Sequence, residues 1–251
     1  MNDHPSQQHR LADASSLIRT GRSSEAIPIL DSIVASDPAC LWALEERGRA
    51  KSFTGDHAGA VADFTQLIEL SPDNPKGFTS RADVHQSVGN LKEAIQDYSK
   101  AISLNPEHTF AYIQRGRLKV LSGDLHGAIT DFSAAIKYDH MGPLSGLLNR
   151  GKTKHLLGDF PGAIEDLTEA IEWERGLCVF APLFRGRARL DAKDYHGAIS
   201  DFTMAITAFP KLTNAYRHRA DAKRAAGDME GALADLSAYD QLGGEDLPAY
   251  S

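Results

Sequence analysis

Histidine and cysteine are the side chains of this sequence best suited to bind a metal ion or to act as nucleophiles, but their spacing favours neither role. The 251-residue chain has 10 His and 2 Cys. No two His have the HExxH or His-x₃-His spacing that puts both imidazoles on one helix face. Cys40 and Cys178 form no CxxC motif, and no disulfide framework is implied. No Ser-His-Asp or Cys-His set is singled out, and no glycine-rich stretch has phosphate-binding spacing. We therefore expect no metal, no cofactor and no enzymatic activity.

Paired arginine and aspartate residues form the most regular charged pattern. At the same place in six successive repeats of about 34 residues, an Arg is followed 16 residues later by an Asp. Six widely spaced pairs do not make an active site, so we interpret each as a structural ion pair between two helices, within a hairpin or across the next one. Such partly buried pairs are expected to fix register more than they add net stability. The predicted pairs are Arg47 and Asp63, Arg81 and Asp97, Arg115 and Asp131, Arg150 and Asp166, Arg185 and Asp201, and Arg219 and Asp235.

These pairs lie inside a sequence repeat. Gly occupies one position of this repeat six times and Lys occupies it once, at steps of 34 or 35 residues. A fixed period of this size is typical of stacked arrays, which grow by adding units rather than around one closed core. We call this position the turn position; its members are Gly21, Gly55, Gly89, Gly123, Gly158, Lys193 and Gly227.

Helical patterns flank each turn position. In the fourth repeat, Ile129, Phe132 and Ile136 follow Gly123 at i, i+3 and i+7, which is one face of a helix. The Asp after the turn position is placed to cap this second helix with its carboxylate. The predicted capping residues are Asp56, Asp124, Asp159, Asp194 and Asp228.

Small residues recur where the two helices of a repeat must cross. Ala stands five residues after every turn position, and Ala or Gly stands seven before it. An aromatic residue or Leu stands nine after the turn position and is expected to fill the space between neighbouring hairpins. Pro ends several repeats, at Pro38, Pro72, Pro106 and Pro210, because it cannot continue a helix.

With its period, its Ala, its Phe and its Pro, the chain resembles tetratricopeptide repeat (TPR) proteins. The resemblance implies an all-α fold, a right-handed alpha-alpha superhelix or TPR solenoid, with about seven helix-turn-helix repeats. First helices would line its concave groove, and second helices would form its convex back. The expected segments are a polar N-terminal tail, residues 1–6, an array over residues 7–242, and a C-terminal tail, residues 243–251. The repeats span about 7–40, 41–74, 75–108, 109–143, 144–178, 179–212 and 213–242.

The two ends of the array differ from its middle. Repeat one lacks both members of the Arg–Asp pair, and its Pro28 is expected in the first turn of the second helix. In repeat seven, Asp240 replaces an inward-facing Ile, and Gly243 with Gly244 stops the helix. Because no further helix follows, apolar surface is expected to stay open there. Weak self-association is predicted through Met229, Leu233, Leu236 and Tyr239.

Charge and hydropathy restrict the classes of partner. The net charge of −7 and the pI of about 5.8 argue against a general nucleic-acid binder. No run approaches the roughly 18 apolar residues of a membrane span, and Met1 to Gln8 contains no apolar signal core. We therefore expect a cytoplasmic protein that binds neither nucleic acid nor membrane.

Residues expected to face the groove indicate a candidate binding site. Six residues before the turn position, repeats four to six carry three consecutive basic side chains, Arg117, Lys152 and Arg187. Large apolar residues in register with them favour an interface over a merely solvated face. The predicted peptide-binding groove comprises Phe110, Ile113, Gln114, Arg117, Leu148, Asn149, Lys152, His155, Phe180, Leu183, Phe184 and Arg187.

One function of the resembled family can be tested on this sequence. TPR co-chaperones grip acidic chaperone tails with a carboxylate clamp, which needs Lys ten residues and Asn six residues before a turn position. Neither residue occurs there in any repeat, so the clamp is absent. The resemblance implies a non-catalytic scaffold that binds a protein or peptide segment in its groove. The groove residues above indicate that this segment is acidic and has large apolar side chains. The alternative is a self-assembling structural array that stacks through its uncapped C-terminal repeat.

Overall fold

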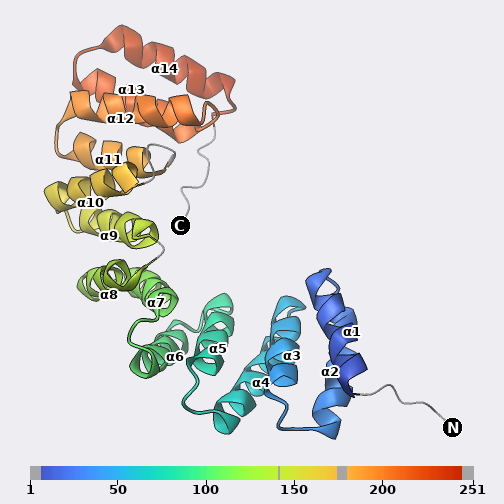
Figure 1. Ribbon diagram of the computed structural model, residues 1–251. Helices are drawn as coiled ribbons and strands as arrows, with labels where there is room; N and C mark the ends of the chain where they lie inside the picture. The colour runs from blue at the N-terminus through green and yellow to red at the C-terminus, as the bar shows by residue number, and fades with distance from the viewer. Residues whose placement is uncertain (1–6, 141, 174–179, 245–251) are drawn as a thin grey trace. The chain divides into compact units, whose positions relative to one another are not determined.

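Fourteen α-helices make up the part of the chain that the computed structural model describes, residues 7–140, 142–173 and 180–244, and no strand occurs there (Figure 1). The helices form seven consecutive pairs, so the predicted all-α array of about seven repeats is confirmed. They are α1 (Gln7–Arg19) and α2 (Ser23–Ser36), α3 (Leu41–Phe53) and α4 (His57–Leu70), α5 (Pro75–Ser87) and α6 (Leu91–Leu104), α7 (Thr109–Leu121) and α8 (Leu125–Tyr138), α9 (Leu144–Leu156) and α10 (Phe160–Trp173), α11 (Phe180–Asp191) and α12 (Tyr195–Ala208), and α13 (Thr213–Ala225) and α14 (Met229–Gln241).

The turn position is a left-handed residue in every repeat. Gly123 has φ +85°, and the other five Gly at this position have φ between +76° and +90°. The next N–H, that of Asp124, donates to the carbonyl of Lys119 at 2.9 Å, which satisfies an otherwise open carbonyl at the end of the first helix. Lys193 adopts the same conformation, φ +64°, although a side chain makes it unfavourable.

The predicted aspartate caps are confirmed in all five repeats that contain them. The Asp124 carboxylate accepts a hydrogen bond from the N–H of Gly127 at 2.9 Å, and Asp56, Asp159, Asp194 and Asp228 make the same bond. A Cβ on Gly127 would lie 2.1 Å from Asp124 Oδ2. Glycine four residues after the turn position therefore leaves room for the cap.

Small residues set how closely the helices of a pair approach. A Cβ on Gly186, seven residues before the turn position, would lie 2.7 Å from the ring of Phe202. At the same position of two other repeats, a Cβ on Gly48 would meet the ring of Phe64, and a Cβ on Gly151 would meet the side chain of Leu167. The large residue nine after the turn position therefore packs onto the glycine of its own first helix.

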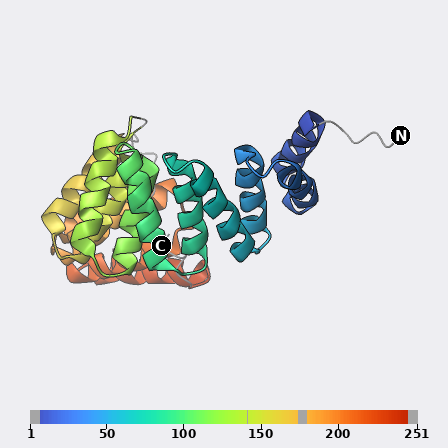
Figure 2. The same ribbon diagram turned by 90° about the horizontal axis from the view of Figure 1, so that it is seen from below.

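The chain divides into two compact parts, residues 1–118 and 119–251. Within each part, consecutive pairs stack so that second helices contact the first helix of the next pair (Figures 1 and 2). First helices also contact one another, α3 with α5 in the first part, and α9 with α11 and α11 with α13 in the second. The buried side chains form a series of clusters along the stack, as expected for a repeat array.

One local prediction is wrong. Pro28 is the sixth residue of α2, beyond its first turn, because that helix already begins at Ser23. Its ring is tolerated at an exposed position. Outside the described residues lie Cys178, Met141, the segment 174–179 and most of both predicted tails.

Candidate functional site

The paired Arg and Asp residues are in contact in five repeats. Arg150 Nη2 lies 2.7 Å from Asp166 Oδ1, and its Nε lies 2.8 Å from Asp166 Oδ2, so the pair is bidentate. The same geometry joins Arg47 to Asp63, Arg81 to Asp97, Arg185 to Asp201 and Arg219 to Asp235. The sixth pair, Arg115 and Asp131, has one residue in each part, and each residue has partners in its own part.

A second cation, which the sequence analysis missed, supports most of these aspartates. Lys154, four residues before its turn position, lies 3.0 Å from Asp166 through Nζ. The same ion pair occurs in four other repeats, between Lys51 and Asp63, Lys119 and Asp131, Arg189 and Asp201, and Lys223 and Asp235. Burial opposes ionisation of Asp235, but hydrogen bonds from Arg219 and Lys223 outweigh it and lower the pKa of that carboxyl.

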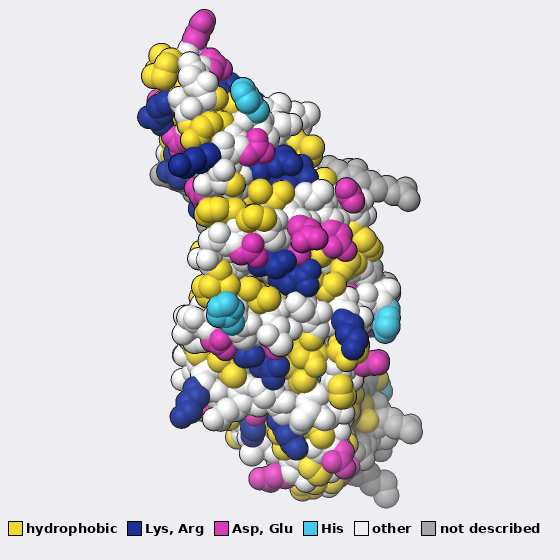
Figure 3. All heavy atoms as spheres, turned by 90° about the vertical axis from the view of Figure 1, so that its left-hand side faces the viewer, with side chains coloured by type: hydrophobic (Ala, Val, Ile, Leu, Met, Phe, Trp, Pro, Cys, Tyr) yellow, Lys and Arg dark blue, Asp and Glu magenta, His cyan; other side chains and the backbone are white. Residues whose placement is uncertain are grey.

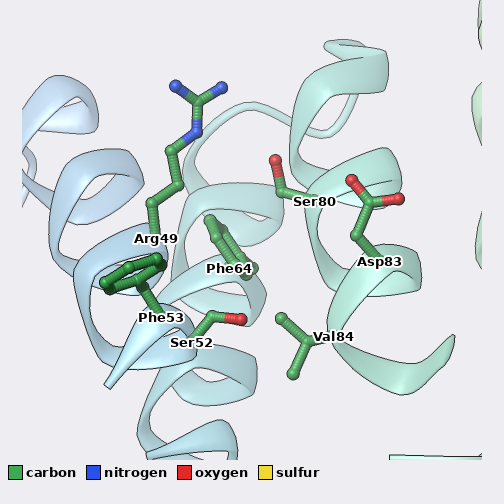
Figure 4. Close-up of a pocket in the computed structure, with 7 residues that line it drawn as sticks. All are labelled: Arg49, Ser52, Phe53, Phe64, Ser80, Asp83 and Val84. Carbon is green, nitrogen blue, oxygen red and sulfur yellow. The ribbon is translucent and has the colours of Figure 1, made fainter. Parts of the chain in front are cut away.

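In the first part, a hollow of about 300 Å³ opens between α3 and α5 (Figure 4). Phe64 of α4 lies between the two first helices, with Arg49 and Asp83 on opposite sides. Arg49 lies 2.9 Å from Glu45, and Asp83 accepts a hydrogen bond from the Tyr98 hydroxyl. Burial, followed by that bond, raises the pKa of Tyr98, which keeps the hydroxyl a donor. This hollow therefore carries charges of both signs.

The second part has an equivalent hollow, of about 120 Å³, between α9 and α11. Leu167 of α10 takes the place of Phe64, and Lys152 and Arg187 take the places of Arg49 and Asp83. Lys152 Nζ lies 4.8 Å from the centroid of the Phe184 ring, within cation–π range. The two basic side chains make this hollow the better place for an anionic group.

A histidine fixes one edge of this second hollow. His155 Nε2 of α9 lies 2.6 Å from Asp191 Oδ2 at the end of α11. The His155 ring also lies 5.6 Å from the ring of Phe160 in α10. This contact links α9 to α11, and it pairs the Asp191 carboxylate at the end of α11 with His155.

Of the predicted groove residues in the second part, Leu183 is assigned wrongly. Its side chain is only 1% exposed and packs in a core cluster with Ala198 and Phe202. Phe184 is 9% exposed and still lines the hollow. The half-buried side chains of Leu148 and Phe180 pack beside a neighbouring cluster around Leu147, Ala170 and Ala181. Asn149 Nδ2 donates to the carbonyl of Ser145 at 2.7 Å.

The other four predicted groove residues belong to the first part. Phe110 is 46% exposed, and its ring packs edge-on against Tyr98 with centroids 6.5 Å apart. Gln114 lines a shallow hollow with Asp83, Gln86 and Ser87. Ile113 is half-buried and Arg117 is exposed.

Sequence reasoning missed the apolar residue two positions before the turn position. Leu156 lines the hollow of the second part and is 62% exposed, and Phe53 lines that of the first part and is 78% exposed. The signal was a large apolar residue in the last turn of a first helix, outside the positions that the core requires. Leu167 was also missed, because its buried position was assigned to the core alone.

Other kinds of site are not found in the described residues. They contain no cluster of three or more His, Cys, Asp or Glu side chains placed to hold a metal ion. None of the helices in residues 7–140, 142–173 and 180–244 has the length and apolar character needed to cross a membrane. On the face shown in Figure 3, described hydrophobic side chains lie in small groups among charged side chains of both signs.

Comparison with known families matches residues 11–75 and 75–108 to tetratricopeptide repeat models. The helix pairs, left-handed turns and small crossing residues described above continue the same pattern to residue 242. The chain belongs to the tetratricopeptide repeat family. A search of curated proteins gives no match to this TPR chain.

Solved TPR structures share the fold. A TPR protein from Parabacteroides merdae is 19% identical, with a TM-score of 0.70 over 94% of this chain and 93% of that one. The C-terminal part of a TPR protein from Cytophaga hutchinsonii is 17% identical, with a TM-score of 0.78 over 95% and 97%. YrrB, described as a TPR protein with an unusual peptide-binding site, is 21% identical, with a TM-score of 0.62 over 74% and 95%.

Proposed function

We propose that this TPR chain is a non-catalytic scaffold that binds an acidic peptide or protein segment with large apolar side chains between α9 and α11. The TPR fold supports a protein-interaction role. The observation that carries the specificity is the pair of basic residues, Lys152 and Arg187, that line this hollow together with Phe184 and Leu167. A similar solved structure, YrrB, is itself described as having a peptide-binding site.

Each side chain of the hollow has a distinct role in this proposal. Phe184 and Leu156 bury an apolar residue of the ligand, at about 25 cal/mol per Å² before the cost of association. Arg187 grips a carboxylate with two parallel bonds, whereas Lys152 acts as a point charge. Phe180 and Leu148, on the same two helices, extend the apolar contact, and Asn149 supplies a polar group. In the first part, Phe110, Ile113, Gln114 and Arg117 of α7 stand at the same repeat positions and are proposed as peptide-binding residues as well.

A peptide array tests this function. Peptides that combine Asp or Glu with Leu, Ile or Phe should be retained, and the same sequences with Lys and Arg in place of the acids should not. The association rate should fall with added salt, because exposed charges act mostly on the encounter. Retention of the basic peptides instead would contradict the proposal.

One observation favours the alternative, a self-assembling array. Met229 and Leu233 of α14 are 57% and 66% exposed, so the last repeat presents apolar surface that a second copy could cover. Light scattering over a concentration series separates the two functions, because only self-assembly raises the mass with concentration.

A further inference from the structure

We call the contact between the second helix of one repeat and the first helix of the next a joint. In each described joint, the first helix of the later repeat contributes two characteristic residues. Twelve residues before the turn position, repeats two to seven carry a buried Ala or Gly. A Cβ on Gly146 would lie 2.5 Å from Ile136 Cγ1 of the preceding repeat, and one on Gly77 would lie 2.8 Å from Ile68 Cγ1. The small residue therefore receives the side chain that stands thirteen after the preceding turn position, which is Val34 in repeat one and Ile in repeats two to six. These small residues are Ala43, Gly77, Ala111, Gly146, Ala181 and Ala215.

The Arg of the ion pair forms the second contact of the joint. Arg219 Nη1 donates to Thr203 Oγ1 of the preceding repeat at 3.0 Å. Arg81, Arg115, Arg150 and Arg185 donate to Thr65, Ser99, Ser133 and Thr168, and Arg47 binds Asp31. The acceptor is always ten residues after the preceding turn position. A first helix that fits a joint thus has a small residue four positions before an Arg.

Helix α14 presents the receiving half of a joint with no helix on it in the described chain. Ser237 stands at the acceptor position, and its described hydrogen bond comes from Gln241 on the same helix. Leu233 is 66% exposed, whereas the residues at its position in the other six repeats are half-buried. Asp240 stands where repeats two to six have Ile, so this half-joint carries a negative charge at a place that is apolar in the other repeats.

The charge of the C-terminal end of the chain favours one kind of binding partner for α14. Residues 225–251 contain six acidic residues and no Lys, Arg or His. Pairing α14 with α14 of a second copy would bring acid against acid, and the acidic residues 245–251 meet the same objection. The first helix of a second copy fits no better. It carries His9 in place of the small residue, Asp13 in place of the Arg, and exposed Ser16 where the other repeats bury their side chain.

We propose that α14 docks a basic amphipathic helix of another protein, in which an Arg follows a small residue by four positions. The Arg donates to Ser237, apolar side chains cover Met229, Leu233 and Leu236, and further basic residues pair with Asp240 and Glu230. This surface is separate from the hollow between α9 and α11, so the docking of a helix on α14 does not depend on the proposed function.

A labelled peptide copying residues 213–225 is the probe, because it contains the joint pattern Ala215 to Arg219 and a basic surface. Fluorescence anisotropy with the full chain should show saturable one-to-one binding. Replacing Arg219 by Ala in the peptide should weaken binding about 5-fold, because the contact to Ser237 is lost. Absence of binding at millimolar protein would overturn the proposal.

Matched variants of the full chain locate the binding. Leu233→Lys should weaken it about 10-fold or more, because it adds a positive charge and removes apolar contact. Ala234→Lys adds the same charge at a position that is exposed in every repeat, and should change affinity less than about 2-fold. Equal effects of the two variants would overturn the site. A protein mass that doubles with concentration, and does so only when Leu233 is intact, would make a second copy the occupant and overturn the choice of partner.

Discussion

Arg150 Nη1 donates a hydrogen bond to Ser133 Oγ of the preceding repeat at 3.0 Å. The same guanidinium is bidentate with Asp166 of its own repeat. One side chain thus joins three helices, α8, α9 and α10. In an array, where stability is the sum of repeat and interface contributions, this Arg contributes to both.

Replacing Arg150 by Leu should lower the free energy of unfolding by about 1–3 kcal/mol, because it leaves the Asp166 carboxylate buried with only Lys154. Ser133→Ala should cost less, about 0.5–1.5 kcal/mol, since it removes one hydrogen bond. Denaturant unfolding measures both. Lys137→Leu, at an exposed position of α8, is the control and should stay within about 0.5 kcal/mol. An Arg150→Leu protein as stable as the control would show that the pair is not structural.

The tight joint between α8 and α9 gives a second prediction. Gly146→Val should destabilise the fold by about 1–3 kcal/mol, because its Cβ would lie 2.5 Å from Ile136 Cγ1. Adding Ile136→Ala should recover part of that loss by opening space. Thermal unfolding compares the double variant with the two single variants. If the loss of stability in the double variant equals the sum of the two single losses, the side chain of Ile136 does not pack against Gly146.

Lys193 is the one residue at the turn position with a side chain, and its φ of +64° is unfavourable. Lys193→Gly should stabilise the chain by about 0.5–1 kcal/mol. The reverse change in another repeat, Gly158→Lys, should destabilise it by about 1–2 kcal/mol. Both values come from denaturant unfolding, and a loss of stability in Lys193→Gly would mean that the Lys side chain makes a contact worth more than the strain.

The lowered pKa of Asp235 sets the sign of an acid effect. An unfolded Asp titrates at about 3.9, so the folded state holds this proton less tightly than the unfolded one. The contribution is fully present above that pH and is lost as the pH falls through the lower folded pKa. The free energy of unfolding should be nearly constant from pH 7 to about 5 and fall below about 4. Asp235→Asn should show a smaller fall, and an equal one would assign the acid effect to other groups.

The sequence predicted the architecture because the turn glycine and the capping aspartate are local features that recur with a fixed period in most repeats. It also predicted the Arg–Asp pairs, since in repeat one the Arg position and the Asp position of the pair both hold other residues. It did not predict that the Arg reaches a hydroxyl in the preceding repeat, because that bond depends on how two repeats stack. Leu183 was misassigned for the same reason: spacing places it on the first helix, but only the packing of α11 on α12 shows that it is buried.

Charge reversal in the hollow between α9 and α11 shows whether acidic peptides bind there. The double variant Lys152→Glu with Arg187→Glu is compared with the single variant Lys137→Glu on the second helix α8, using an acidic apolar peptide selected from the array. We expect the double variant to bind the peptide about 10-fold more weakly or worse, while Lys137→Glu changes the affinity less than about 2-fold. Equal affinity of the double variant and the control would place the binding site elsewhere.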